Sequence, residues 1–294
     1  MAEVANRGAL HAAAWMTGAI VSFSTMAVAG RELGDVHDTF EIMLFRSLTG
    51  IVIVVGVAGL LGRLHEVRAQ HLPLHAVRNL AHFTGQNLWF YAVTVAPLTQ
   101  VFALEFTTPI WVTLLAPLFL GEKLTRTRAF VAAMGFVGIL IVTRPWSEPL
   151  EAGVLTAAAS AIGFAATTIA TKRLTRVATV TCILFWLTVF QSGFGLVAVF
   201  YDGTVTWPTL ATLPLLIYVA CAGLFAHLCI TNALLAAPAS VVAPLDFLRL
   251  PLIAVVGMVV YNEPLVGWVF VGALVIFTAN TLNIRAEARR ASDV

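Results

Sequence analysis

Charge is the scarcest property of this sequence. Only 11% of its 294 residues are charged, whereas 60% are hydrophobic. A soluble domain of this length normally has about 25% charged residues to cover its surface. The composition therefore excludes a soluble globular protein and places the chain in a lipid bilayer. The net charge of +2 gives no reason to expect a nucleic-acid partner.

Cysteine and catalytic motifs are also scarce. The three cysteines, Cys182, Cys221 and Cys229, lie in apolar runs without C-x-x-C spacing, so neither a disulfide framework nor a metal site is expected. No cofactor is predicted either. The sequence has no H-E-x-x-H, no phosphate-binding loop and no convincing G-x-S-x-G. These absences argue against an ATP-driven pump. They also argue against a membrane-embedded enzyme, although an enzyme is kept as the alternative function from a different class.

Long apolar runs are what the sequence has instead. A helix that crosses a bilayer needs about 20 mainly apolar residues. Because backbone polar groups cannot stay unpaired in hydrocarbon, such runs must be helical, with kinks expected at internal prolines such as Pro109 and Pro251. The predicted fold class is an all-α integral membrane protein with ten transmembrane helices, at residues 8–29, 39–61, 75–95, 98–120, 126–143, 152–171, 180–200, 210–235, 239–260 and 265–284.

The second half of the chain repeats the first. Residues 96–124 match residues 237–265 without a gap, at a constant offset that aligns Glu105 with Asp246 and Glu122 with Glu263. Each half contains five predicted spans. Five is odd, so the second half must enter the membrane from the opposite side. The sequence therefore predicts two inverted five-helix repeats within one membrane domain, at residues 1–146 and 147–294.

The positive charges predict an orientation. Of the 17 Lys and Arg residues, only Arg31 and Arg144 lie on the side away from the N-terminus, and only Arg46 and Arg249 lie within spans. Because Lys and Arg accumulate in cytoplasmic loops, both termini should be cytoplasmic. We expect a multi-pass protein of the plasma membrane, in a bacterium the inner membrane.

These features resemble the drug/metabolite transporter superfamily, in its ten-span EamA branch. The resemblance covers the whole chain and rests on the duplicated five-span unit, the Ala-Pro turn before spans four and nine, and the acidic step after them, at Glu122 and Glu263. It implies a secondary transporter of small metabolites that is not an enzyme. The layout is similar to YddG-type amino-acid exporters, which favours export of neutral or aromatic amino acids. Uptake of S-adenosylmethionine, riboflavin or another metabolite is the alternative. The expected partners are a small-molecule substrate and the bilayer, and we expect a monomer.

Polar residues at helical spacing indicate where a substrate would bind. Asn79, His82, Gln86 and Trp89 recur every three or four residues and share one face, and the offset aligns Gln86 with His227. We expect these faces to oppose each other across a cavity, although both histidines could instead hydrogen-bond neighbouring helices. The predicted substrate-binding residues are Trp15, His82, Gln86, Trp89, Gln100, Trp111, Ser160, Trp186 and His227.

Four charges inside the spans need partners, because an unpaired charge in a bilayer is costly. Glu105 points about 140 degrees away from Gln100 on an ideal helix and lies at a depth similar to Arg46, so these two are expected to pair. Asp246 and Arg249 are three residues apart and are expected to pair with each other. We interpret all four as structural ion pairs; the alternative is a carboxylate that binds a proton or a substrate ammonium.

Residues at the span edges and on the small-residue faces are given structural roles. Glu122 and Glu263 each precede a new span, where a negative charge stabilises the positive end of a helix. Gly18 and Gly163 are expected to let neighbouring helices approach closely.

Overall fold

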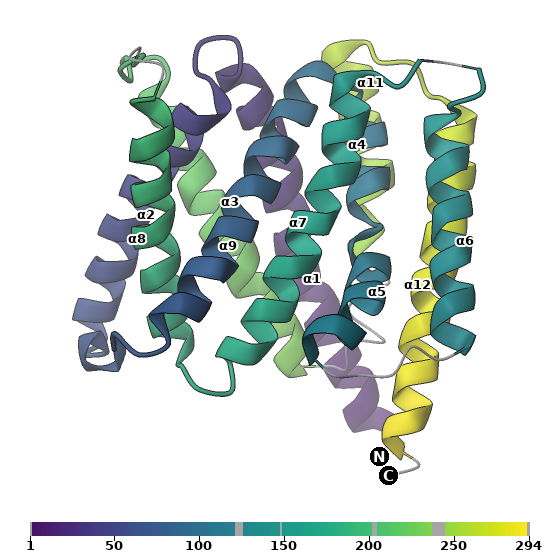
Figure 1. Ribbon diagram of the computed structural model, residues 1–294, viewed down its shortest axis with the longest axis horizontal. Helices are drawn as coiled ribbons and strands as arrows, with labels where there is room; N and C mark the ends of the chain where they lie inside the picture. The colour runs from purple at the N-terminus through teal and green to yellow at the C-terminus, as the bar shows by residue number, and fades with distance from the viewer. Residues whose placement is uncertain (1, 121–125, 148, 202–204, 237–244, 293–294) are drawn as a thin grey trace.

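A computed structural model describes the chain except for residues 1, 121–125, 148, 202–204, 237–244 and 293–294. Within the described ranges every regular element is helical (Figure 1). The helices are α1 (Ala2–Leu33), α2 (Thr39–Leu60), the short 3-10 turn η1 (Leu64–Glu66), α3 (Leu72–Val95), α4 (Leu98–Glu105), α5 (Thr108–Leu120), α6 (Arg126–Thr143), α7 (Ala152–Leu174), α8 (Val180–Val199), α9 (Leu213–Ala236), α11 (Arg249–Tyr261) and α12 (Gly267–Ser292).

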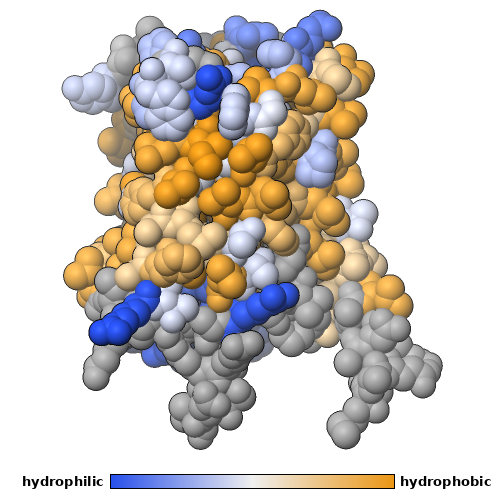
Figure 2. Space-filling model, turned by 90° about the vertical axis from the view of Figure 1, so that its right-hand side faces the viewer, coloured by the Kyte–Doolittle hydropathy of each residue, from blue (hydrophilic) through white to orange (hydrophobic). Residues whose placement is uncertain are grey.

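The helices have the length and composition of membrane spans. Eight described segments are long and apolar enough to cross a bilayer, and α11 is a shorter apolar helix. Figure 2 shows the consequence on one face, where hydrophobic residues form a broad band and hydrophilic residues gather at both ends. Helix α3 is not among the eight, because it carries polar side chains such as Arg78 and His82 that are buried inside the bundle. The protein is therefore a multi-span membrane protein.

The predicted runs are helical over most of their described length, but residues 210–212 and 265–266 precede the helices predicted to contain them, and two runs are broken. The run 98–120 was predicted as a single helix, but it folds as α4 and α5 with a break at Phe106 and Thr107. The ninth run also has a break, at Phe247 and Leu248, directly before α11. Its first residues lie outside the described part of the chain.

Equivalent residues start equivalent helices in the two halves. The Asp38 carboxylate accepts a hydrogen bond from the Glu41 backbone N–H at 2.8 Å, and the Glu41 side chain accepts from the Asp38 N–H, which completes a capping box at the start of α2. Thr179, the counterpart of Asp38 in the second half, caps α8 by accepting from the Cys182 N–H at 3.2 Å. The repeat thus extends to the signals that begin each helix.

Helix packing also follows the repeat. The most extensive contacts join α1 to α9, α3 to α7, α2 to α8 and α6 to α12. Glycines allow the closest of these approaches. A Cβ at Gly163 of α7 would lie 2.8 Å from the Gly85 Cα of α3, and a Cβ at Gly18 of α1 would lie 2.9 Å from the Cys229 Sγ of α9. Both glycines have the packing position expected of them.

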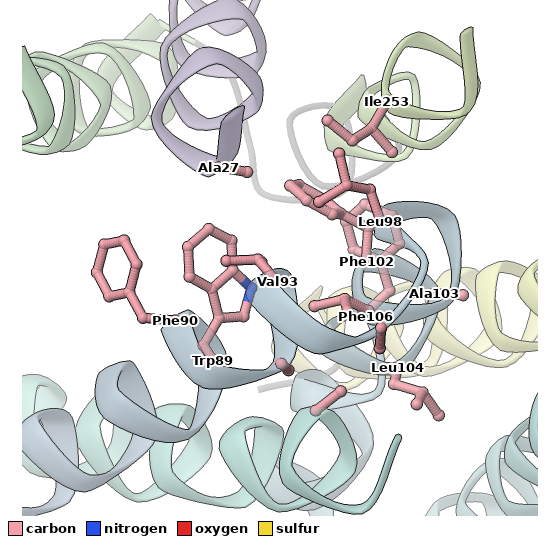
Figure 3. Packing of buried hydrophobic residues seen from close by; sticks show 14 of the residues in the cluster. Ala27, Trp89, Phe90, Val93, Leu98, Phe102, Ala103, Leu104, Phe106 and Ile253 are labelled. Carbon is pink, nitrogen blue, oxygen red and sulfur yellow. The ribbon is translucent and has the colours of Figure 1, made fainter. Parts of the chain in front are cut away.

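The end of the bundle opposite the two termini is filled by hydrophobic side chains. In Figure 1, α1 begins and α12 ends at the same end, whereas α11 and the start of α4 lie at the other. The labelled side chains in Figure 3 come from α1, α3, α4 and α11, together with Phe106 at the break after α4, and each is at most 5% exposed. We call this set the seal; its largest members include Trp89, Phe90, Val93, Leu98, Phe102 and Ile253.

A polar clasp lies at the same end, which we define as Arg31, Glu32, Tyr261 and Glu263. Arg31 pairs with Glu263 and donates to the backbone carbonyls at the end of α3, and Glu263 Oε2 accepts from the Leu98 N–H at 2.9 Å. The Tyr261 hydroxyl donates to Glu32 Oε1 at 2.8 Å. Glu263 therefore does stabilise a helix N-terminus, but that of α4 rather than the next helix in sequence. Glu122 lies outside the described residues.

Candidate functional site

The candidate site is built around the two helix breaks. Pro109 has no N–H, so the Glu105 carbonyl loses its helical donor; the Thr108 hydroxyl donates to that carbonyl instead, at 2.7 Å. The Phe106 carbonyl accepts from Asn280 Nδ2 of α12 at 2.9 Å. The freed backbone groups at this break thus have side-chain partners, which a break inside a membrane requires.

The two breaks meet in space. Phe106 and Phe247 occupy them at equivalent positions of the repeat, and their rings stack with centroids 4.4 Å apart and an interplanar angle of 26°. Phe247 also packs edge-on against Phe277 of α12, at 4.8 Å. The repeated break therefore places the residue before each phenylalanine, Glu105 and Asp246, in the same region of the bundle.

These two carboxylates share one arginine, and we call Glu105, Asp246 and Arg249 the break cluster. Arg249 Nη2 lies 3.1 Å from Glu105 Oε1 and 3.0 Å from Asp246 Oδ2. The second oxygen of Glu105 accepts from Trp89 Nε1 at 2.8 Å. The Arg249 guanidinium is also surrounded by the rings of Phe23, Phe102 and Phe106, at 5.0–5.1 Å, a favourable cation–π arrangement.

The expected pairing of Arg46 with Glu105 is wrong. Arg46 of α2 donates to Gln86 Oε1 of α3 and contacts Met43 Sδ at 3.6 Å, whereas Glu105 pairs with Arg249. The reason is the direction of the Glu105 side chain. It faces the break before α11, and Arg249 is the first residue of α11. The expected pairing of Asp246 with Arg249 is present.

A cavity of about 550 Å³ begins at the break cluster. Helices α1, α3, α4, α5, α7, α9 and α12 contribute to its wall, with the segment that precedes and begins α11. Its aromatic lining consists of Phe23, Trp89, Phe106, Phe164, Phe247 and Phe277. Its polar lining consists of Arg78, His82, Gln86, Glu105, Thr108, Thr167, Thr168, Thr171, His227, Asp246, Arg249, Asn280 and Thr281. This volume suits a small organic molecule.

The cavity extends away from the seal. Its inner limit includes Trp89 and Glu105, and its wall continues to Arg78 near the start of α3, Thr171 near the end of α7 and Ile284 of α12. The start of α3 and the ends of α7 and α12 lie towards the end of the bundle that carries both termini (Figure 1). The side chains of Thr168 and His227 on this wall are exposed. The cavity is therefore closed on one side and extends towards the other.

Arg78, on the cavity wall away from the break cluster, donates to neutral side chains. Arg78 donates to Thr171 Oγ1 at 3.2 Å and to Asn79 Oδ1 at 2.8 Å. Within the described ranges no carboxylate pairs with it. His82 Nδ1, buried one helical turn further along α3, has no hydrogen-bond partner in the same part of the chain. Arg78 is thus available to attract an anionic or strongly accepting group near the mouth.

Four of the nine predicted substrate-binding residues line this cavity. His82, Gln86 and Trp89 form one stripe on α3, and His227 lies on α9, packed edge-on against Phe23 at 5.8 Å. The spacing of polar residues along the two helices thus identified one shared wall. Contact of these four residues with substrate remains a prediction, since no ligand is present.

The other five predicted residues lie elsewhere. Trp15 donates to His11 Nε2 at 3.2 Å, Gln100 contacts the Val142 carbonyl at 3.5 Å, and Trp186 donates to the Arg68 carbonyl at 2.9 Å. Trp111 packs edge-on against Phe136, and the buried Ser160 bonds its own helix. Gln100 shares the unbroken α4 with Glu105 but faces α6, whereas Trp111 lies beyond the break, across which ideal helical geometry does not continue. Substrate contact by these five is a prediction that this cavity does not support.

The sequence analysis missed a lining face on α12. Phe277, Asn280 and Thr281 follow the i, i+3, i+4 spacing of one helical face, and the packing of α12 against the break shows their relevance. Phe106 and Phe247 did have a signal, because they are identical residues at equivalent positions of the repeat. A search for repeated aromatics next to repeated acids would have found them.

The bundle and its internal chamber define a multi-span membrane protein that encloses a site for a small solute. The model of the EamA-like transporter family matches residues 10–144 and 151–285, one segment in each half of the chain. The chain belongs to this family.

Named relatives agree with that assignment. A riboflavin transporter of Rhizobium johnstonii is 32% identical over 225 residues, which cover 75% of this chain and 73% of that protein. An S-adenosylmethionine uptake transporter of Rickettsia bellii is 26% identical over 280 residues, which cover 95% of this chain and 94% of that protein. A solved crystal structure covers 95% of this chain with a TM-score of 0.64 and 17% identity, over 98% of its own length, and shows likeness of fold alone.

Proposed function

We propose that this protein is a secondary transporter that moves a small organic metabolite across the bacterial inner membrane by alternating access. The observation that carries the proposal is the cavity itself, which lies at the meeting point of two broken helices and is closed at one end by the seal and the clasp. Broken helices around a central site are a recurrent feature of secondary transporters. With both termini cytoplasmic, this arrangement is an inward-facing state.

The moving parts are proposed to be two inverted repeats of five spans each, residues 1–146 and 147–294. The helix contacts support this division, because exchanging the halves converts the α1–α9 contact into the α7–α3 contact. It also maps the α2–α8 and α6–α12 contacts onto themselves. A rocking motion of such halves would open the sealed end while closing the cavity mouth.

We propose S-adenosylmethionine as the first substrate candidate and riboflavin as the second. The similarity to the Rickettsia relative supports S-adenosylmethionine and extends over almost the whole chain. The similarity to the Rhizobium relative supports riboflavin, at higher identity but over less of the chain. The six aromatic rings of the cavity suit either fused-ring system. Export of neutral or aromatic amino acids remains a proposal that rests on the ten-span layout alone.

Counterflow in proteoliposomes tests the function. The full chain is reconstituted, loaded with unlabelled solute, and mixed with labelled S-adenosylmethionine, riboflavin or tryptophan outside. We expect saturable exchange for one of these classes, and a loss of at least tenfold in Gln86→Ala, which removes the partner of Arg46. Asp35→Asn, an exposed loop change, is the control and should leave exchange unchanged. No exchange above empty liposomes with any of the three solutes would contradict the proposal.

A further inference from the structure

The break cluster contains one positive and two negative side chains. Arg249 Nη2 serves both Glu105 and Asp246, at 3.1 and 3.0 Å. The repeat explains why a second arginine is missing, because the position equivalent to Arg249 in the first half is Thr108. With all three groups ionised, the inner end of the cavity has a net charge of −1. An uncompensated charge at this depth is costly and indicates a function.

The two carboxylates are not equivalent. Both oxygens of Glu105 have donors, Arg249 and the Trp89 indole, so this side chain is held in place. Asp246 uses only Oδ2, and its Oδ1 has no hydrogen-bond partner in the described part of the chain. The Asp246 side chain is also the more exposed, at 27% against 17% for Glu105. Asp246 is therefore the carboxylate with capacity for a further ligand.

Asn280 is a second and independent unpartnered acceptor on the same cavity wall. Its side chain is 3% exposed, and its Nδ2 donates to the Phe106 carbonyl at the break. This bond fixes the amide so that Oδ1 is an acceptor, and that oxygen has no donor within the described ranges. A buried acceptor without a donor costs free energy. Two such acceptors beside one cavity suit a ligand that brings hydrogen-bond donors and positive charge.

Among the described residues that line the cavity, no other charged group contacts the break cluster. From α3 the cavity receives Arg78 and His82, and from α9 it receives His227. Arg78 lies eleven residues before Trp89, about 16 Å along the helix axis, and Arg46 lies behind Gln86. The lining residues of α1, α7 and α12 are uncharged. A ligand that enters through the cavity can therefore supply the compensating charge.

We propose that Asp246, which shares Arg249 with Glu105 and lines the same cavity as Asn280, accepts a single positive charge during each transport cycle. The charge has two possible sources with the same chemistry at the carboxylate: an ammonium or sulfonium group of the substrate, or a proton that forms an O–H bond at Asp246 and is released when the cavity faces the other side. This inference rests on the proposed transport function and names the group that couples charge to it.

Competition in proteoliposomes of the full chain examines the first source. The competitors are S-adenosylmethionine, S-adenosylhomocysteine and 5′-methylthioadenosine, which share the adenosine group but carry two, one and no positive groups. If the substrate supplies the charge, the wild-type protein prefers the charged members, and Asp246→Asn reduces this preference at least tenfold. Asp246→Glu should keep most of it, and the exposed Asp35→Asn should keep all of it.

An imposed pH gradient examines the second source. If a proton supplies the charge, the gradient drives accumulation of the transported solute, including neutral riboflavin, and Asp246→Asn abolishes accumulation while retaining counterflow. Asn280→Leu should reduce the same property that Asp246→Asn reduces, either charge preference or gradient-driven accumulation, but by a smaller factor. It serves as the alternative variant if Asp246→Asn elutes as an aggregate in size-exclusion chromatography.

The outcomes separate this inference from the function on which it rests. The inference is overturned if Asp246→Asn keeps both charge preference and gradient-driven accumulation within twofold of wild type. It is also overturned if the wild-type protein shows saturable counterflow but neither charge preference nor gradient-driven accumulation. In that case the transporter proposal stands. Absence of counterflow for every solute overturns the proposed function and the inference together.

Discussion

At the scale of single residues, the site depends on small groups that satisfy broken backbone. Thr108 and Asn280 supply donors to the carbonyls that the break leaves without helical partners. Trp89 both lines the cavity and holds Glu105 in place. Because a side chain such as Trp89 both lines the cavity and stabilises the break, substitutions at the break should alter transport and stability together.

Gly163 provides a cleaner test of packing at this scale. A Cβ there would lie 2.8 Å from the Gly85 Cα of α3, so Gly163→Ala must push α7 away from α3. We expect a loss of about 1–3 kcal/mol, measured by equilibrium unfolding in mixed detergent micelles. Gly193→Ala is the matched control, because a Cβ on that glycine of α8 meets no atom within 4 Å. Its helix propensity should stabilise the protein by up to about 1 kcal/mol. Equal effects of the two changes would contradict the packing role.

At the scale of elements, the seal and the clasp together close one end of the cavity. The clasp joins the end of α1 to the end of α3, the start of α4 and the end of α11. It is thus placed across the elements that would have to separate for the sealed end to open.

Removing the clasp should favour opening of that end. Arg31→Gln loses the pair with Glu263 and weakens the contacts to two backbone carbonyls. We expect an impermeant thiol reagent added outside to label Ala27→Cys, a buried position of the seal (Figure 3), at least fivefold faster in this variant. The measurement uses a background without Cys182, Cys221 and Cys229.

A surface ion pair supplies the control for the clasp. Arg63→Gln removes an exposed contact with Glu66 at 3.8 Å, and such contacts contribute little. Labelling of Ala27→Cys should therefore stay at the wild-type rate in that variant. If Arg31→Gln also leaves the rate unchanged, the clasp does not hold the sealed end closed.

At the scale of the whole molecule, the orientation makes a direct prediction. Thr168→Cys lies on the exposed cavity wall towards the termini, and Tyr201→Cys lies beyond α8 at the other end. With cytoplasmic termini, an impermeant reagent should label Thr168→Cys in inside-out vesicles and Tyr201→Cys in intact cells. Both variants use the cysteine-free background. The reverse pattern would show that the bundle is inserted the other way.

The sequence by itself determined the class of protein and most of its elements. Few charges and long apolar runs leave helices in a bilayer as the only solution, since hydrocarbon offers the backbone no partners. The predicted spans 39–61 and 180–200 begin where α2 and α8 begin, and the polar spacing on α3 identified His82, Gln86 and Trp89 as one wall. These are local properties, which periodicity reports directly.

Only the tertiary structure decided how distant residues meet. Sequence depth suggested Arg46 as the partner of Glu105, but the crossing of the two breaks brings Arg249 to that carboxylate. Packing also decided which face of α4 meets the cavity: Glu105 lines it, whereas Gln100 contacts the Val142 carbonyl of α6. Asn280 became visible only through its bond to Phe106. Helical periodicity predicts a face within one helix; which helix lies opposite, and in which direction a broken helix turns, depends on packing between segments far apart in the chain.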